Sequence, residues 1–562
     1  ILTLALILIY GIQKSRKQHN MADYFLGDRE MPWYIVLFSI MATQASAITF
    51  LSAPGQAYTD GMRFVQYYFG LPIAMVVLCI GFVPIFRRLK VYTAYEFLET
   101  RFDLKTRVLA SGLFLLQRGA STGISIYAPS IILSSLLGWN IYWTNIFMGG
   151  LLIIYTVLGG ARAVAYTQQL QLFIIFAGMA LAGWIVVHLL PAGISFTDAL
   201  HVSGKLGKLN VIVPTIHVTS RTWWQDKYNI WSGTIGGFFL ALSYFGTDQS
   251  QVGRYLTGKS LKESRMGLLL NGLIKIPMQF LILLIGALLF VFYLYAKAPV
   301  FFNDAAVREI YTTPYGPAMH RINDRFALLE STKGQKVDEL VAALHQKNLP
   351  LEASITDTLH RLEAASNALH GKVVALVHRA LPGIDRDDTN YIFLHFVKDY
   401  LPRGLVGLLI AVIFLATWGS TSATLNSLAS TSLVDIHKRI WKKDGSPQYY
   451  LRASRWWTVF WGLFCIGVAQ FAQGLGSLIE AVNVLGSLFY GTILGIFLMA
   501  FYSKKVSGTA VFWAAVVAEI GVIGIYKTAW LSFLWLNVVG CLLVIGIAWT
   551  LHLGKAIILN DR

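Results

Sequence analysis

Residues 39–58 read SIMATQASAITFLSAPGQAY, and residues 238–256 read FFLALSYFGTDQSQVGRYL. Both stretches belong to long apolar segments, yet neither suits a continuous helix. The first is rich in small and hydroxylated residues, and we expect Pro54-Gly55 to end or kink it. The second carries the polar run 246–249 in its second half. Unwound helices inside a membrane are tolerated where they line a cavity, so the pair predicts a binding site between broken helices. For the first stretch, close helix packing through small residues is an equal alternative.

The composition agrees with a membrane protein. The chain has 562 residues, of which 56% are hydrophobic and 13% charged, and its mean hydropathy is +0.58. A soluble chain carries about 25% charged residues. These values exclude a soluble multidomain enzyme and a disordered protein. Apolar runs recur along the chain, and they predict an all-α polytopic membrane protein with about 13 transmembrane helices of about 20 residues.

The expected spans divide the chain into three parts. Spans zero to seven occupy 1–296, a polar insert occupies 297–402, and spans eight to twelve occupy 403–562. The stretch 1–13 is interpreted as the remnant of a first span, not as a signal peptide. Breaks at matching places in spans one and six predict two inverted repeats, the first over 32–190 and the second beginning at about 231. The spans are 1–13, 32–58, 64–86, 108–137, 140–159, 165–190, 231–256, 266–296, 403–433, 454–474, 477–502, 507–527 and 530–553.

The charge distribution predicts the orientation. The formal net charge is +17, but the basic residues flank apolar spans, which is a sign of membrane topology and not of nucleic-acid binding. With the first loop inside, the inside loops carry 25 Lys and Arg and the short outside loops carry 6. The positive-inside rule then places the N-terminus outside and the C-terminus in the cytoplasm. We expect the plasma membrane, which is the inner membrane in a Gram-negative bacterium.

The insert falls on the outside face. Its sequence predicts amphipathic helices, as in DELVAALHQKN (338–348). Six of the twelve histidines lie here, and no two have i,i+4 spacing. A solvated helical cap is therefore favoured over metal binding. Recruitment of an extracytoplasmic partner that delivers substrate is an open alternative.

Ionisable residues inside apolar spans are the next signal, because each costs several kcal/mol unless it is paired or hydrated. Arg118 and Lys275 lie in mid-span, and either can bind a substrate or form a structural salt bridge. Asp248, in the span-six break, is expected to be structural and paired with Arg254. Span eight carries nine Ser and Thr residues between 417 and 432. Their oxygens suit Na⁺, although hydroxyls that bond back to i−4 carbonyls are the alternative.

Four motifs give the chain a family resemblance. They are GGARAVAYTQQLQ (159–171), TDQSQVGRYLTGKS (247–260), STSATLNSLASTSLVDIHKR (420–439) and LGIFLMAFYSKKVSGTAVFWA (494–514). Together with QRGASTGISIYAP (117–129), they resemble the sodium/solute symporter family, which includes sodium–glucose, monocarboxylate, vitamin, iodide and sialic acid transporters. The resemblance implies a leucine-transporter-type fold, a five-plus-five inverted repeat with broken helices one and six, and Na⁺-coupled uptake.

The resemblance also implies a sodium site between spans one and eight. Mapped by motif, its residues are Ala42, Ala45, Ala416, Gly419 and Ser420. Gly419 stands where a serine is usual, so one side-chain oxygen is lost. A second sodium position seen in some members maps to Ser422 and Gln168, but Gln168 replaces the usual aspartate. We therefore expect one Na⁺ per cycle.

The substrate site implied by the resemblance lies at the midplane between spans one, two, three, six, seven and ten. Tyr68 replaces an acidic or amide group of the sugar carriers, and Tyr244 matches an inner-gate tyrosine that could meet Gln44. Arg118 approximately matches an arginine that binds carboxylate in sialic acid carriers. The residues are Gln44, Ser46, Thr49, Tyr68, Arg118, Tyr244, Lys275 and Asn483.

We therefore expect a Na⁺-coupled secondary symporter, not an enzyme, that imports a small organic acid or acidic sugar, with sialic acid as a candidate. The expected partners are the substrate, Na⁺ and the lipid bilayer, without nucleic acid or an organic cofactor. A neutral-sugar symporter is the alternative substrate class. An uncoupled carrier or sensor that kept the fold is the alternative of another class, and Gly419 and Gln168 favour it.

Overall fold

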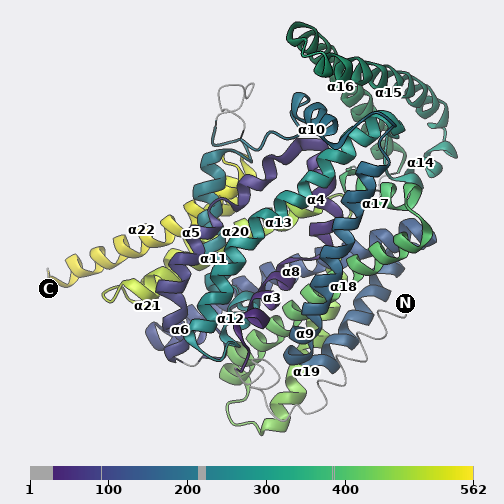
Figure 1. The fold of residues 1–562 in the computed structure, drawn as a ribbon. Helices are drawn as coiled ribbons and strands as arrows, with labels where there is room; N and C mark the ends of the chain where they lie inside the picture. Colours follow the sequence, from purple (N-terminus) through teal and green to yellow (C-terminus); the bar gives the residue numbers. More distant parts are fainter. Residues whose placement is uncertain (1–29, 90, 213–222, 382–383, 385–386, 561–562) are drawn as a thin grey trace.

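The computed structural model describes all residues except 1–29, 90, 213–222, 382–383, 385–386 and 561–562 (Figure 1). The described chain is helical, with one isolated β-bridge between Met31 and Gly258 and no strand. Eight of the described helical stretches are long and apolar enough to cross a membrane. The expected polytopic helical membrane protein is thus confirmed. Predicted span zero, 1–13, lies outside the described residues.

The first predicted broken helix is broken, but not where the sequence predicted. Helix α3 (Trp33–Gln44) ends at Ala45-Ser46, and α4 (Ala47–Asp60) continues from there. Pro54, expected to end the span, lies inside α4. Its neighbour Gly55 instead permits a close approach, since a Cβ there would lie 2.0 Å from the Thr389 carbonyl oxygen. The Pro-Gly pair therefore reflects helix packing and not the break.

The second break lies where it was predicted. Helix α11 (Gly237–Thr247) ends at Asp248, whose backbone is extended, and α12 (Gln249–Leu256) begins beyond it. The Asp248 carboxylate accepts a hydrogen bond from the Ser250 amide at 2.8 Å. It therefore caps the second half-helix, as a short acidic side chain at an N-cap does.

Long helices surround the two breaks. Helix α13 (Leu261–Ala296) packs along α3 and α4, whereas α18 (Arg403–Thr431) packs against α9, α8 and α3. Helix α9 is continuous over Ile141–His188 and covers both spans predicted at 140–159 and 165–190; its 48 residues are about twice the number that crosses a bilayer. The other long helices are α8 (Leu104–Leu137), α19 (Pro447–Gln470), α20 (Leu478–Tyr502), α21 (Gly508–Lys527) and α22 (Phe533–Asn560).

Shorter helical segments complete or connect these spans, and the candidate span Ala47–Leu89 runs through several of them. A 3₁₀ segment covers Gly61–Tyr68, and π segments cover Leu78–Phe82, Ser232–Gly236 and Ser432–Trp441. The short α-helices are α5 (Leu71–Val77), α6 (Val83–Leu89), α7 (Glu96–Arg101) and α10 (Phe196–Lys205).

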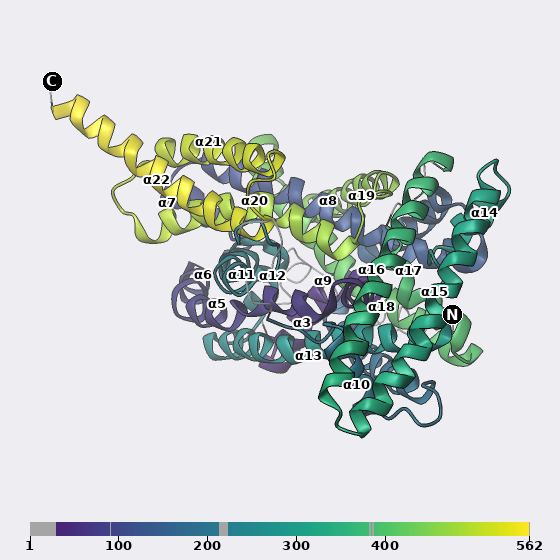
Figure 2. The same cartoon turned by 90° about the horizontal axis from the view of Figure 1, so that it is seen from above.

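The polar insert is helical. It contains α14 (Asp304–Tyr311), α15 (Gly316–His345), α16 (Leu349–Ala380) and α17 (Thr389–Tyr400). Helices α15 and α16 pack together as a hairpin that projects beyond the ends of α4 and α13 (Figure 1), and Figure 2 shows the same hairpin from above. Buried Lys333 pairs with Glu330 at 2.6 Å and Glu363 at 2.7 Å, which joins the two helices. Helix α17 packs on α4, so the insert contacts the first broken helix.

Candidate functional site

A central cavity of about 140 Å³ lies between the two broken helices and α8, α13, α18 and α20. Its wall brings together all eight residues predicted for the substrate, which come from six separate segments of the chain. They are Gln44, Ser46, Thr49, Tyr68, Arg118, Tyr244, Lys275 and Asn483. Ser420, predicted for sodium, also lines it.

Two basic side chains line this cavity, and none of its described lining residues is acidic. Arg118 is already paired, because its Nε lies 3.6 Å from Oδ2 of Asp248 and its guanidinium lies 5.4 Å from the Tyr244 ring centroid. Asp248 also accepts a hydrogen bond from the Tyr490 hydroxyl at 2.8 Å. The predicted Asp248–Arg254 pair is wrong, since Arg254 donates to the Ala423 carbonyl at 3.2 Å.

Lys275 is the second basic side chain. It is 2% exposed, and no carboxylate of the described chain lies within ion-pair distance of its ammonium. Its Nζ lies 5.7 Å from the Tyr68 ring centroid. Because a buried charge without a partner is costly, Lys275 is stable as an ammonium only when an anion enters the cavity beside it.

Amide and hydroxyl groups fix the remaining wall. Gln44 donates to Oδ1 of Asn271 at 3.0 Å, and the Tyr244 hydroxyl accepts from Gln251 at 2.7 Å. We expected Tyr244 to contact Gln44, but in the structure these two side chains form hydrogen bonds with other residues, Gln251 and Asn271 respectively. Tyr67 donates to Asn483 at 3.0 Å, which orients that amide. These groups offer hydrogen bonds to a polar solute.

Sequence reasoning missed a polar face of α8. Four polar residues lie on the side of the helix that lines the cavity, at steps of four, one and three along the sequence. The hydroxyl of Thr421 on α18 also lines it, without a hydrogen-bond partner in the described part of the chain. The signal available in the sequence was the recurrence of polar residues near Arg118 on one face of a helix. The α8 residues are Gln117, Ser121, Thr122 and Ser125.

The predicted sodium residues lie where α3 ends and α18 passes. At the α3 break, the described hydrogen bonds use the carbonyls of Met41, Gln44 and Ser46, and not those of Ala42 and Ala45. On α18, the Ser420 hydroxyl donates to the Ala416 carbonyl at 2.9 Å. Such back-bonding was the alternative to an ion site, yet a hydroxyl that donates keeps its oxygen lone pairs for a cation.

The residues predicted for a second sodium position have other partners. Ser422 shares a hydrogen bond of 2.8 Å with Thr156. Gln168 accepts from Ser39 at 3.0 Å and donates to the Gly419 carbonyl at 2.9 Å. Helix α9 therefore contacts both α3 and α18 through one amide.

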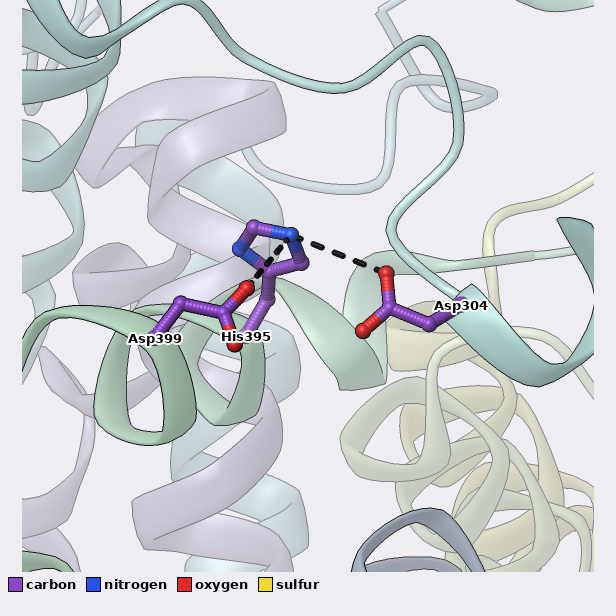
Figure 3. A group of neighbouring side chains, drawn as sticks. All are labelled: Asp304, His395 and Asp399. Atoms are coloured by element: carbon purple, nitrogen blue, oxygen red, sulfur yellow. Dashed lines mark ion pairs between the residues drawn. The ribbon is translucent and has the colours of Figure 1, made fainter. Parts of the chain in front are cut away.

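A separate cluster in the insert region groups Asp304, His395 and Asp399 within 4.8 Å of one another (Figure 3). His395 Nε2 lies 3.2 Å from Asp399, four residues away, and 3.7 Å from Asp304. Lys398 forms ion pairs with both aspartates, and the Tyr293 hydroxyl bonds the other His395 nitrogen at 2.9 Å. The cluster thus already contains a cation, which explains its acidic groups without a metal.

Comparison with known proteins defines the family. The model of the sodium:solute symporter family matches residues 24–314 and 361–518, which is more than half of the chain. The chain belongs to the sodium:solute symporter family. The unmatched stretch between the two parts contains all of α15 and the start of α16, so the hairpin lies largely outside the family core.

Several relatives of this symporter-family protein are similar over most of its length. It is 26% identical over 96% of its length to the sodium/sialic acid symporter SiaT of Proteus mirabilis (strain HI4320), of which 91% is covered. It is also 26% identical over 88% of its length to sodium-coupled monocarboxylate transporter 1 of Homo sapiens, of which 66% is covered. These relatives are transporters and not enzymes, and their substrates differ.

The fold has a match among solved structures. A Na⁺-coupled sialic acid symporter in a substrate-bound outward-open state superposes with a TM-score of 0.73 at 24% identity, over 98% of this chain and 95% of that one. The match shows that this chain shares the fold. Family and fold together support transport across a membrane with Na⁺ as the coupling ion.

Proposed function

We propose that this protein is a Na⁺-coupled symporter that imports a small organic monoanion, either an acidic sugar such as sialic acid or a monocarboxylate. The charge of the central cavity carries the proposal. Arg118 and Lys275 supply two positive charges, Asp248 neutralises one, and one positive charge remains for a substrate carboxylate. A neutral sugar would leave the Lys275 ammonium without a partner, so the charge favours an acid.

We further propose that one Na⁺ binds between α3 and α18. The proposed ligands are the carbonyls of Ala42 and Ala45, which accept none of the described hydrogen bonds at the α3 break, together with the Ala416 carbonyl, Gly419 and the Ser420 hydroxyl. A bound ion would hold the first broken helix against α18 and order the adjacent cavity wall. Substrate would then bind more tightly with Na⁺ present, and by linkage Na⁺ would bind more tightly with substrate. Loosening of the α3–α18 contact would release both inward.

The proposed topology follows the predicted one. Two repeats, 32–190 and from about 231, are related by inversion within about 13 spans, and 297–402 forms an extracytoplasmic insert. The N-terminus lies outside and the C-terminus in the cytoplasm. The matching breaks in α3–α4 and α11–α12 support the repeat, and the asymmetry of Lys and Arg supports the orientation.

Uptake into proteoliposomes tests the substrate class. We expect an inward Na⁺ gradient to drive uptake of N-acetylneuraminic acid or a short monocarboxylate, whereas the methyl ester of the same compound is not taken up. Exchange of Na⁺ for choline should abolish uptake. Uptake of ester and acid at equal rates would refute the proposed anion site.

Two variants test whether Lys275 supplies the positive charge that binds the substrate carboxylate. Lys275→Met should weaken binding of the acid by about 100-fold, because it removes the unpaired ammonium at a cost of 2–3 kcal/mol. Lys262→Met removes an exposed lysine of the same helix and should leave binding unchanged. If Lys275→Met binds the acid with normal affinity, Arg118 and not Lys275 binds the substrate carboxylate.

A further inference from the structure

The segment that joins α18 to α19 carries positive charge that the described protein does not neutralise. Residues 436–456 contain six Lys and Arg and one acidic residue, Asp444. Arg439 pairs with Glu99, but no carboxylate of the described chain lies within ion-pair distance of the other five basic side chains. All five are exposed, and they are Lys438, Lys442, Lys443, Arg452 and Arg455.

Aromatic side chains hold this segment against the start of α19. The Tyr450 hydroxyl donates to the Lys442 carbonyl at 2.9 Å, and Nζ of Lys442 lies 4.6 Å from the Tyr449 ring centroid. The rings of Trp441 and Trp457 stack with their centroids 5.8 Å apart. The lysines of the connecting segment therefore lie beside the two arginines in the first turns of α19, and the five basic groups form one surface.

One face of α19 shows where this surface lies relative to the bilayer. Arg452, Trp456, Phe460 and Leu463 follow one another at steps of four, four and three residues, so they share a face of the helix. Trp456 is 73% exposed, and Phe460 and Leu463 are exposed as well. Exposed tryptophans of membrane proteins lie at the interface between headgroups and hydrocarbon. The face thus passes from charged to aromatic to aliphatic, which places Arg452 at the level of the lipid headgroups.

We propose that this surface binds the headgroups of anionic phospholipids in the cytoplasmic leaflet. Clusters of Lys and Arg directly beside a membrane-spanning helix attract anionic lipids, and an arginine can bind a phosphate through two hydrogen bonds. The positive-inside rule explains the sign of the charge on this side, but not the aromatic contacts that hold the basic groups at headgroup level. The inference goes beyond the proposed symport and uses the proposed orientation only to name the leaflet.

Other basic side chains at the same ends of the helices have partners within the protein. Nε of Arg107 donates to Asp435 at 2.7 Å, and Nε of Arg265 donates to the Cys79 carbonyl at 2.8 Å. Their donors are thus already bonded, whereas those of the connecting segment are free for a lipid phosphate. Helix α18 begins directly after the insert and ends at this segment, so the two lie at opposite ends of that helix (Figure 1).

Native mass spectrometry of the purified full chain tests the proposal, in micelles that contain equal amounts of dioleoyl phosphatidylglycerol and dioleoyl phosphatidylcholine. The unmodified chain should retain the anionic lipid in preference to the zwitterionic one. Replacement of four basic residues by glutamine should lower this preference at least about tenfold, because each Lys or Arg near the headgroups adds to the attraction. The four substitutions are Lys442→Gln, Lys443→Gln, Arg452→Gln and Arg455→Gln.

A matched variant controls for the loss of charge. It removes four exposed basic residues of the α15–α16 hairpin that form no ion pair in the described chain, and it should keep the full lipid preference. An unmodified chain that retains both lipids equally would overturn the inference, as would equal preferences in the two variants. The control substitutions are Arg321→Gln, Arg325→Gln, Lys372→Gln and Arg379→Gln.

Discussion

The two broken helices differ in how the backbone groups at the break, which lack helical hydrogen bonds, find partners. At the α3–α4 break the residues are small, no side chain caps either half-helix, and the carbonyls of Ala42 and Ala45 stay out of the local hydrogen bonds. At the α11–α12 break, Asp248 caps α12 and pairs with Arg118 and Tyr490. The first break thus keeps carbonyl oxygens that no described residue at the break bonds, whereas the protein itself satisfies the second break.

This difference assigns separate roles to the two breaks. Because a helix end without partners is unstable in a low-dielectric environment, the first break should be ordered only when an ion occupies it. The second break should stay ordered in all states and hold Arg118 at the cavity wall. If Na⁺ and the acid bind as proposed, they occupy adjacent walls of one cavity, which is what coupling requires.

Removal of Asp248 should have the largest effect. Asp248→Ala leaves Arg118 buried without its counter-charge and removes the cap of α12, so we expect a loss of about 3–5 kcal/mol in stability. Thermal denaturation in detergent measures it. Asp357→Ala, which breaks an exposed pair with Arg361, should cost about 1 kcal/mol or less. Similar losses in both variants would show that the second break is not locked by Asp248.

Gly55→Ala tests how the insert holds the other half of the first broken helix. The added methyl group would lie 2.0 Å from the Thr389 carbonyl oxygen, so α17 must move away from α4, at a cost of about 1–3 kcal/mol. Gly371→Ala, in α16 with no atom within 4 Å of the new Cβ, should be neutral or stabilising. If Gly55→Ala is as stable as the unmodified chain, the close approach of α17 has no role.

Ser420→Ala tests whether Na⁺ and the substrate bind to different residues. It should raise the half-saturating Na⁺ concentration about tenfold, whereas affinity for the acid at saturating Na⁺ changes less than about twofold. The control is Ser427→Ala, whose hydroxyl bonds the Ala423 carbonyl about two turns further along α18. Titration of Na⁺ and acid in each variant gives both affinities, and an equal effect of the two serine variants on Na⁺ would place the ion elsewhere.

The smallest expected effect is a pH dependence of thermal stability that arises in the insert beside α4. Burial lowers the pKa of His370, but the hydrogen bond and charge of Asp388 outweigh it and raise the pKa above its ordinary value. The protonated imidazole thus stabilises the fold fully below its unfolded pKa of about 6.5, and this contribution is lost as pH rises through the raised value. Thermal stability should fall slightly from pH 6 to pH 8, and His370→Gln should reduce that slope. An unchanged slope would exclude His370 as its source.

Sequence reasoning predicted the parts that local chemistry determines. A polar run inside an apolar span indicates a break, so the α11–α12 break was found at its residues. A charge in mid-span is costly unless it is paired or hydrated, so Arg118 and Lys275 stood out as candidates for the substrate site. The first break was predicted at Pro54 because proline is a strong local signal, whereas small residues such as Ala45 and Ser46 carry a weak one.

Contacts between distant segments could not be predicted. Arg254 lies six residues from Asp248 and was the obvious partner, but the fold brings Arg118 to it from another helix. The packing of Gln171 against Gly419 likewise depends on the mutual placement of α9 and α18. Sequence spacing does not determine such pairs until the helices are positioned.

Thermal stabilisation of the purified protein by a matched acid and ester, each in NaCl and in choline chloride, tests the central claim most directly. The account predicts stabilisation by the acid in NaCl, little or none by the acid in choline chloride, and none by the ester in either salt. Equal stabilisation by the acid in both salts would contradict the assignment of the open α3–α4 break to Na⁺ and of the cavity charge to a coupled anion.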